Sequence, residues 1–458
     1  MRLLKEKNNR KIMNAWAFYD WANSVYSLVI TSTIFPIYYS IITTAAERDE
    51  YVAETGQWIK VPVRHSINIF GNSYHPDAVY GYSLTISFFI VVLLSPILSS
   101  LADTIGNKKS FLQFFCYLGA TSCMGLALFT GLNTVFLGLL FSITASVGFW
   151  GSLVFYNSFL PDLATPDKQD ALSAKGYVYG YIGSVILVVI CLFLIQVVAQ
   201  TADQALIWTR VTFLLTGAWW FGFSQYTFRH LPQHGAVIKT IPKDIIKTSF
   251  RELFKVGHDL FRTANLKYFL ASFFFYSVGM QTIFLMATLF GKSEINLPQD
   301  RLILTLLLIQ IEAIFGAVIF SRLSKRIGNK NVISIAIVLW IVACLWAYFL
   351  DAGNPNVRLH FYIIAGIIGL VMGGLQALSR STYSKLLPPD DLDNTTYFSF
   401  YDVLEKIAII IGTFIFATLI EHYNNMRFAA LSMAVFFAIG LIFIRFLKVK
   451  ITPNKETL

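Results

Sequence analysis

The chain has 458 residues, of which 56% are hydrophobic and only 14% are charged, and its mean hydropathy is +0.61. Soluble globular proteins carry about a quarter charged residues, so this composition excludes a soluble domain. The net charge of +10 does not indicate a nucleic-acid partner, because the basic residues lie between long apolar runs, as membrane topology requires.

Apolar runs long enough to cross a bilayer, which takes about 20 helical residues, follow one another along the whole chain. They predict an all-α integral membrane protein with 12 transmembrane helices in two pseudo-symmetric six-helix bundles. The predicted spans are 16–42, 80–101, 111–130, 134–160, 176–199, 206–228, 266–290, 300–320, 331–350, 359–383, 398–420 and 427–447. The predicted organisation is a cytoplasmic N-terminus (1–15), an N-terminal six-helix bundle (16–228), a cytoplasmic linker with an amphipathic helix (229–265), a C-terminal six-helix bundle (266–447) and a cytoplasmic tail (448–458).

Lysine and arginine gather in the N-terminus, the linker, the tail and the loops on the same side. The positive-inside rule therefore predicts a multi-pass protein of the cell membrane with both termini in the cytoplasm. The basic, polar segment 1–14 precedes a span too long for a secretory signal, so no cleavable leader is expected.

Span 1 carries a polar stripe, because Asp20, Asn23, Ser24, Ser27 and Thr31 follow one another at helical spacing and so share one face. A charge inside a bilayer costs at least about 2.5 kcal/mol, so Asp20 needs a partner or a wet cavity. We expect Asp20, Asn23 and Ser27 to contact the transported solute. The alternative is that Asp20 only anchors the cytoplasmic end of the helix.

The loop 43–79 is long and contains two alternating segments, 58–63 and 66–70, the second followed by Gly71-Asn72. This pattern predicts a small external hairpin.

A charged turn occurs twice. Most of the tract 98–109 recurs as 320–330 at one constant offset, and each copy ends an apolar run and begins a short charged turn. A turn duplicated at nearly half the chain length implies two similar halves, and parallel halves in a membrane protein indicate a transporter with its site between them.

The repeated turn also predicts a gate. We expect Asp103 to meet the inner end of a helix in the other half, with Lys108 nearby, in a contact that breaks when that side opens. A plain solvated turn is the alternative. Gly106 and Gly328 are expected to supply the positive φ of a tight turn.

The linker alternates apolar and basic residues at helical spacing, which predicts an amphipathic helix on the inner membrane surface. A binding site for a regulatory partner is the alternative. The apolar positions are Ile246, Phe250, Leu253, Gly257 and Leu260, and the basic ones are Lys243, Lys247, Arg251 and Lys255.

Spans 5, 7 and 8 add small and polar positions. Small residues at helical spacing in span 5 (Gly176, Gly180 and Gly183) predict close helix packing. Gln281 in span 7 is a candidate solute hydrogen-bonder, or otherwise a contact between helices. In span 8, Glu312 lies on nearly the opposite face from Gln310, and its mid-span depth makes it a candidate proton-coupling site; a neutral, hydrogen-bonded Glu312 is the alternative.

Spans 10 and 11 hold the remaining charges. In span 10, Gln376 and Arg380 share a face, and Gln376 is expected to line the solute cavity. Arg380 either snorkels to the surface or pairs with a solute carboxylate, Asp402 or Glu405. In span 11, Asp402 and Lys406 are four residues apart, acid first, which favours an ion pair. Glu405 beside them leaves one acid in excess, so the three residues form either a proton-coupling cluster or a structural ion pair.

The repeated turn resembles the loop between spans 2 and 3 of the major facilitator superfamily, because Asp103, Gly106, Lys108 and Lys109 fit its pattern. Asn107 and Ser99 depart from it, and Lys325 replaces the acid in the second copy. The segments Ala17–Tyr26, Ser95-Pro96 and Gly373–Ser381 resemble the vacuole-effluxer-like branch, which is related to the autophagy-associated amino-acid effluxers. The resemblance implies transport, with amino acids as a candidate cargo, and leaves the identity of the cargo open. Span 5 lacks the motif of the drug antiporters, which argues against multidrug efflux.

These observations predict a monomeric secondary carrier that moves a small polar, amino-acid-like solute by alternating access, coupled to protons and surrounded by membrane lipids. A lipid or amphiphile translocase is one alternative, which the 41 Phe residues favour slightly; a non-transporting receptor with a carrier fold is another. No phosphate-binding Gly-x-x-x-x-Gly-Lys loop, metal-ligand spacing or nucleophile–base constellation stands out, so no cofactor, metal or enzyme activity is expected.

Overall fold

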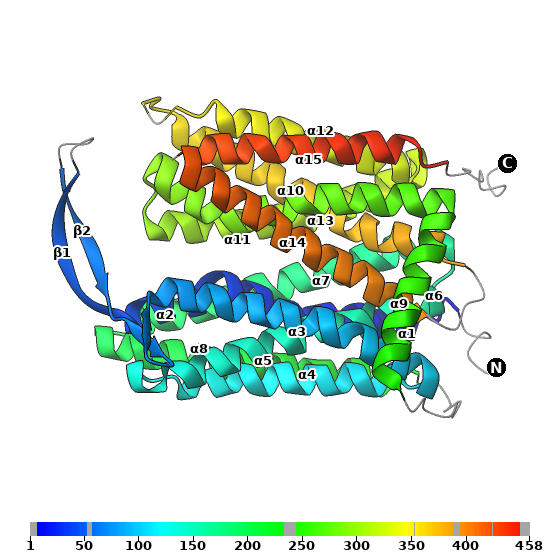
Figure 1. The fold of residues 1–458 in the computed structure, drawn as a ribbon, viewed down its shortest axis with the longest axis horizontal. Coiled ribbons are helices and arrows are strands. Elements are labelled where there is room, and N and C mark those ends of the chain that lie inside the picture. The colour runs from blue at the N-terminus through cyan, green and yellow to red at the C-terminus, as the bar shows by residue number, and fades with distance from the viewer. Residues whose placement is uncertain are drawn as a thin grey trace.

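The protein consists of long, roughly parallel helices arranged in two groups, one above the other (Figure 1). The computed structural model describes residues 7–52, 57–232, 244–351, 353–388, 394–423 and 425–448. The predicted tail 448–458 therefore lies almost wholly outside the described residues, as do 1–6 of the N-terminal segment and 233–243 of the linker.

The first group, here the N-terminal half, and the second, the C-terminal half, each have a separate hydrophobic core. The N-terminal half contains α1 (Arg10–Val25) continued by η2 (Tyr26–Ile34) and α2 (Phe35–Ile42), then α3 (Pro76–Ile105), α4 (Lys108–Gly125), α5 (Val135–Ser158), α6 (Leu160–Leu163), α7 (Pro166–Phe193) with η5 (Leu194–Val198), and α8 (Ala202–His230). The C-terminal half contains α10 (Ala264–Ile295), α11 (Gln299–Ile327), α12 (Asn329–Tyr348), α13 (Val357–Leu386), α14 (Asn394–Tyr423) and α15 (Met426–Arg445).

Eleven helices among the described residues are long and apolar enough to cross a membrane. The twelfth, α8, has 29 residues and packs against α1 and α4 within the N-terminal half. Polar residues such as Arg210 and Gln225 lower its hydropathy, but its length exceeds the roughly 20 residues that a span needs. The predicted fold of 12 helices in two bundles is therefore confirmed.

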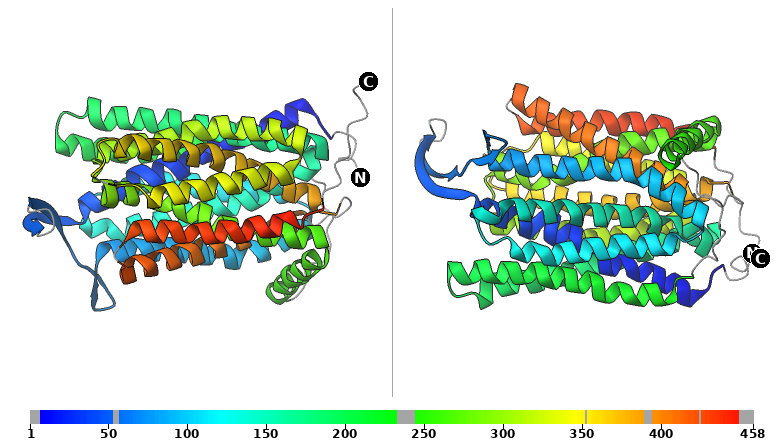
Figure 2. Two further views of the ribbon diagram at one scale, coloured as in Figure 1. Left: turned by 90° about the horizontal axis from the view of Figure 1, so that it is seen from above. Right: turned by 60° about the horizontal axis from the view of Figure 1, so that its bottom comes forward.

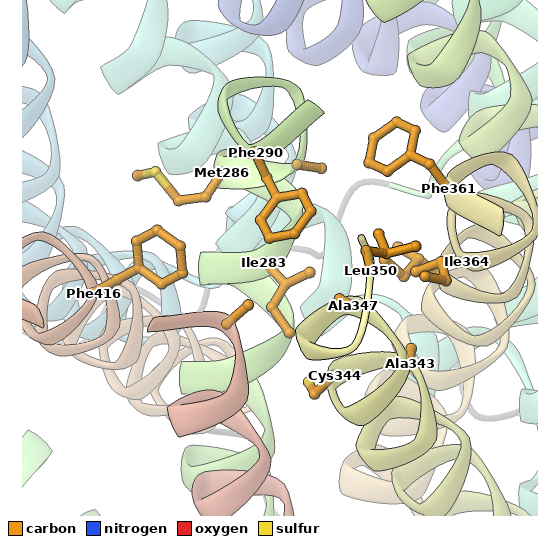
Figure 3. Close-up of a pocket in the computed structure, with 13 residues that line it drawn as sticks. Ile283, Met286, Phe290, Ala343, Cys344, Ala347, Leu350, Phe361, Ile364 and Phe416 are labelled. Carbon is orange, nitrogen blue, oxygen red and sulfur yellow. The ribbon is translucent and has the colours of Figure 1, made fainter. Parts of the chain in front are cut away.

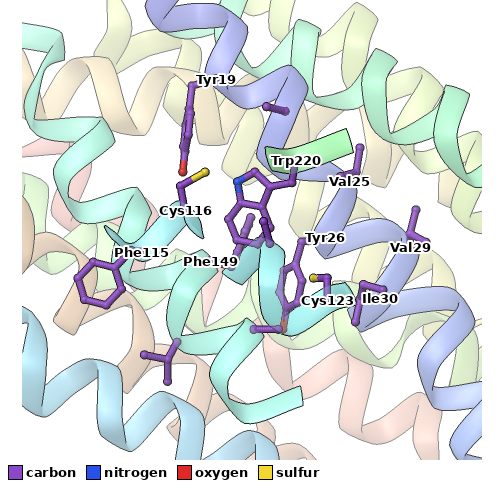
Figure 4. Close-up of a cluster of buried hydrophobic side chains, with 14 of the residues drawn as sticks. Tyr19, Val25, Tyr26, Val29, Ile30, Phe115, Cys116, Cys123, Phe149 and Trp220 are labelled. Carbon is purple, nitrogen blue, oxygen red and sulfur yellow. The ribbon is translucent and has the colours of Figure 1, made fainter. Parts of the chain in front are cut away.

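Close packing in the N-terminal half depends on aromatic rings seated against small residues. Figure 4 shows Tyr26, Phe149 and Trp220 gathered in this core beside Cys123. The Trp220 ring lies where a side chain on Gly119 would be, so the glycine lets α4 and α8 approach closely. Gly180 and Gly183 of α7 likewise face α1, as the small face of span 5 predicts.

Both repeated turns are tight and depend on glycine. Gly106 ends α3 with φ of 73° and Gly328 ends α11 with φ of 82°. A side chain is strained at these angles, which explains the glycines at both positions. Both turns lie at the end of the bundle that carries the chain termini, here called the terminal end (Figure 1).

The segment after α2 forms two antiparallel hairpins at the opposite end, here called the hairpin end (Figure 1). Strand β1 (Thr44–Val52) pairs with β2 (Gln57–Arg64), and β3 (Ile67–Ile69) pairs with β4 (Asn72–Tyr74). Both predicted strands exist, but each has its own partner, because the acidic segment before 53 also becomes a strand. The described residues of this segment therefore form two hairpins, where one was predicted.

One further helix, α9 (Ile245–Arg262), crosses the others instead of running along them (Figure 1). It packs against α3 of the N-terminal half and against α10 and α14 of the C-terminal half. In the two views of Figure 2 it projects from the side of the bundle at the terminal end.

Candidate functional site

A polar cavity lies between the two halves. Its volume is about 190 Å³, which is space for on the order of ten waters. Helices of both halves line it. The polar residues in its wall are Asp20, Ser24, Ser27, Thr31, Ser32, Ser146, Asn157, Ser184, Gln281, Gln310, Gln376, Ser379, Arg380, Asp402 and Glu405, and its aromatic residues are Phe88, Phe149, Trp150, Tyr177, Tyr181, Phe273, Phe284 and Tyr401.

A buried ion pair crosses from one half to the other at this cavity. The guanidinium of Arg380 on α13 lies 3.4 Å from Oδ2 of Asp20 on α1. The Tyr156 hydroxyl donates to the same Asp20 oxygen at 2.8 Å. The sequence offered Asp402, Glu405 or a solute as the partner of Arg380; the structure pairs it with Asp20, because α13 faces α7 and α1 here.

The rest of the Arg380 side chain is held by the N-terminal half. Its Nε donates to the Ser173 hydroxyl at 2.9 Å, one terminal nitrogen donates to the Ser173 carbonyl at 2.8 Å, and the other to Asn157 at 3.1 Å. The guanidinium also lies over the rings of Tyr177 at 4.3 Å and Trp16 at 5.0 Å. Arg380 does not snorkel to the surface; it joins the two halves.

The three charged residues of span 11 form a second cluster on α14. The Lys406 ammonium lies 2.8 Å from Asp402 and 3.4 Å from Glu405. It also lies 3.6 Å from the ring centre of Trp150 on α5, in the other half. Gln281 of α10 donates to the remaining oxygen of Glu405 at 2.9 Å. Two acids with one base leave this cluster with one negative charge when all three are ionised.

The cluster is not fully satisfied. Oδ2 of Asp402 is buried and has no hydrogen-bond partner among the described residues. A buried carboxylate oxygen of this kind can accept a hydrogen bond from a group bound in the cavity. Since Asp402 and Glu405 both line the cavity, a solute in it would reach them.

Two further predicted contact residues lie in the cavity wall, and one does not. Gln376 accepts a hydrogen bond from the Tyr181 hydroxyl of the other half at 2.7 Å, and Ser27 lies in the wall of the cavity on η2. Asn23 is fully buried outside the wall, where its Oδ1 accepts from Ser24 at 3.3 Å.

Glu312 does not line the cavity, and its neighbour Gln310 does. Glu312 is half-buried on the other side of α11, beside Gly366 of α13. Helical spacing shows that the two residues face apart but not which of them faces inward. The acids in the cavity wall are therefore Asp20, Asp402 and Glu405, and not Glu312.

The predicted gate residues lie in contacts at the terminal end. Oδ2 of Asp103 accepts from both the backbone N–H and the hydroxyl of Thr396, each at 2.8 Å, in the first turn of α14. A carboxylate at a helix N-terminus satisfies free N–H groups and the helix dipole. Lys108 pairs with Asp162 within its own half, and Asp162 in turn accepts from Asn394 of α14 at 2.8 Å.

A matching contact forms at the second turn. Asn329 donates to Asp170 on α7 at 2.9 Å, and Ser324 donates to it at 3.2 Å. Lys385 of α13 pairs with the same carboxylate at 2.5 Å. Hydropathy did not identify Asp162, Asp170 and Ser173, because they lie outside the predicted spans, in a segment whose composition is that of a loop.

A separate pocket lies inside the C-terminal half (Figure 3). Its volume is about 50 Å³, and its wall consists of apolar side chains that include the Met286 thioether and the Cys344 thiol. Figure 3 shows Ile283, Phe290, Phe361 and Phe416 around it. It offers no polar group to a polar solute.

Comparisons with known proteins agree on one kind of molecule. The model of the family described as "Vacuole effluxer Atg22 like" matches residues 8–455. The chain is 32% identical to the MFS-type transporter YxiO of Bacillus subtilis, over 96% of this chain and 95% of that protein. It is 24% identical to Autophagy-related protein 22 of Saccharomyces cerevisiae, over 93% of this chain and 89% of that protein.

Solved structures of major facilitator transporters share the fold. The fucose:proton symporter of E. coli has a TM-score of 0.66 at 15% identity, with 96% of this chain and 98% of that chain covered. The proton:xylose symporter XylE has a TM-score of 0.69 at 12% identity, with 96% of each chain covered.

Proposed function

The chain belongs to the Atg22-like vacuole effluxer family of major facilitator transporters, and we propose that it is a proton-coupled carrier of a small, amino-acid-like solute. Membership makes it a multi-pass membrane transporter and not an enzyme. The solute, the coupling ion and the residues that serve them are the proposal, and they rest on the chemistry of the cavity between the halves.

The observation that carries the proposal is the uneven charge of the cavity. Asp20 and Arg380 neutralise each other, whereas Lys406 faces two acids. The excess negative charge and the aromatic wall suit a group with an ammonium, which carboxylates and ring faces both attract. The Arg380 guanidinium in the same wall suits a carboxylate, which would share this cation with Asp20. A zwitterion satisfies both ends, and an uncharged amphiphile satisfies neither.

Glu405 is the acid that we assign to proton coupling. Its side chain is 18% exposed, so the cavity reaches it, while Asp402 holds the closer contact to Lys406. With Glu405 protonated, the cluster has one acid and one base and is neutral. Proton binding therefore changes the charge that the solute and the Trp150 ring of the other half meet, which biases the arrangement of the halves.

Access is proposed to alternate by rocking of the two halves. The Asp103–Thr396 and Asp170–Asn329 contacts join the halves at the terminal end. We therefore infer that the solute reaches the cavity from the hairpin end in this conformation. We place the monomer in the cell membrane with its termini in the cytoplasm. The cavity then faces outward.

The test is counterflow in proteoliposomes with amino acids, sugars and a short-chain amphiphile as separate solutes. Exchange of an amino acid, without exchange of the other two classes, is expected. Exchange of the amphiphile alone would instead identify a translocase, and binding without exchange a receptor.

Glu405→Gln and Glu312→Gln make the coupling test specific, because the same chemical change falls inside and outside the cavity. Glu405→Gln is expected to retain counterflow and to lose accumulation driven by a pH difference, since the cluster is then permanently neutral. Glu312→Gln is expected to retain both. The opposite result would move the coupling site to α11.

A further inference from the structure

The outward face of α9 is unpartnered and carries charge of one sign. Lys247, Arg251, Lys255 and Arg262 are exposed, and none of them pairs with an acid in the described part of the chain. Between residues 247 and 262 one acid is exposed, Asp259. Its carboxylate lies 3.6 Å from Nδ1 of the neighbouring His258. Successive cations stand at helical spacing, so they form one basic stripe.

Large apolar side chains stand next to this stripe. Phe254 is 73% exposed and Phe261 is 44% exposed, one above the other at i and i+7. The opposite face is buried, with Ser249, Leu253 and Leu260 against the bundle. A helix that covers its core-facing side and still exposes two phenylalanines has a second apolar contact to satisfy.

The position of α9 identifies that contact. The helix runs across the spanning helices (Figure 1), an orientation that would place it parallel to the plane of a membrane. It projects from the side of the bundle at the terminal end, at the level where the spans end (Figure 2). A soluble acidic partner would account for the charges alone, whereas the exposed Phe254 and Phe261 also require an apolar neighbour, which a bilayer provides at this level. Basic residues with aromatic residues along one face are the pattern of helices held at the headgroup layer.

We propose that the outward face of α9 binds anionic phospholipid headgroups, with Arg251 and Lys255 on the phosphates and Phe254 in the acyl boundary. The helix holds this lipid at the seam between the halves. Glu252 accepts from Ser100 of α3 at 2.5 Å, and Gly257 and Phe261 pack on Phe400 of α14. Lipid bound to α9 is therefore attached to both halves at once.

The test measures lipid contact directly and does not depend on transport. A fluorophore is attached at His258→Cys, which is exposed between the cations, while the four native cysteines are buried. The full-length protein is reconstituted with bromine-labelled phosphatidylglycerol or bromine-labelled phosphatidylcholine at the same low fraction. Stronger quenching by the anionic lipid is expected.

Each basic residue near a membrane surface contributes about a five-fold preference for anionic lipid. Arg251→Gln with Lys255→Gln is therefore expected to abolish most of the difference between the two lipids. Lys292→Gln with Arg358→Gln removes the same charge at the hairpin end, where both residues are exposed, and is expected to leave the difference intact.

Equal quenching by the two lipids in the unmodified helix would overturn the proposal. Absence of quenching by either lipid would overturn it as well and would favour a soluble acidic partner for the stripe. Quenching that falls equally in both double variants would assign the effect to net charge and not to α9.

Discussion

Replacing Asp20 with Asn is expected to release the closed terminal end of the molecule. The substitution keeps the shape of the side chain and an oxygen that accepts from Tyr156, and removes only the charge that faces Arg380. Asp20 belongs to α1 and Arg380 to α13, so losing the ion pair destabilises the arrangement in which the two halves are in contact. When they separate, Arg380 regains water and needs no carboxylate.

The size of the effect follows from burial. Asp20 is 4% exposed and Arg380 is 2% exposed, and removing one partner of a buried pair costs about 3–5 kcal/mol. Arg380 keeps its hydrogen bonds to Ser173 and Asn157, so we expect a cost at the lower end of this range. About 3 kcal/mol is roughly a 100-fold change in the equilibrium between closed and open arrangements.

Distances between spin labels at Ser110→Cys and Asn331→Cys measure this equilibrium. Both positions are exposed, one at the start of α4 and one at the start of α12, so the labels report the separation of the halves. Asp20→Asn is expected to add a longer distance. The matched change Asp203→Asn, at an exposed acid outside the pair, is expected to add none. A folded Asp20→Asn protein with the original distances would refute the role given to this ion pair.

Three further predictions concern charge and packing. Lys406→Met leaves buried acids without a counter-ion and is expected to lower stability by about 3–5 kcal/mol in thermal unfolding, with partial recovery when Asp402→Asn is added. Asp103→Asn weakens a helix cap by about 1 kcal/mol and is expected to shift the label distances less than Asp20→Asn does. Gly316→Ala makes a methyl group clash with a backbone carbonyl of α13 and is expected to lower the unfolding temperature. Gly222→Ala, whose methyl group meets no atom within 4 Å, is expected to leave that temperature unchanged. Equal unfolding temperatures for the two variants would contradict the packing argument.

Hydropathy predicts the fold of this chain because lipid-facing residues must be apolar over a whole span. It fails at the span ends that face protein. Span 5 was predicted to begin at 176, whereas α7 begins at Pro166. The missing turns carry Asp170 and Ser173, which are polar because they contact the C-terminal half and not lipid. A polar helix end buried in protein and a solvated loop have the same composition.

The site could be predicted only as far as single helices determine it. The spacing of Asp402 and Lys406 predicts an ion pair, and that pair is present because both residues stand on one face of α14. The contact of Lys406 with Trp150 joins residues of different halves, and no periodicity relates them. The sequence does not decide between Gln310 and Glu312 for a related reason, since a helix has two sides and only its neighbours decide which side faces the cavity.

The repeated turns show how duplication constrains geometry without fixing chemistry. Each turn follows the second helix of its half and contacts the fifth helix of the other half, α14 in one case and α7 in the other. At the first turn the acid is on the turn, as Asp103; at the second it is on the partner helix, as Asp170, and Lys325 stands where the turn's acid would be. A hydrogen bond between two surfaces requires a donor on one and an acceptor on the other, but not a particular assignment. The duplicated backbone therefore brings the same two surfaces together twice, while the acid can stand on either surface. For this reason, a sequence match to Asp103 alone could not reveal the second contact.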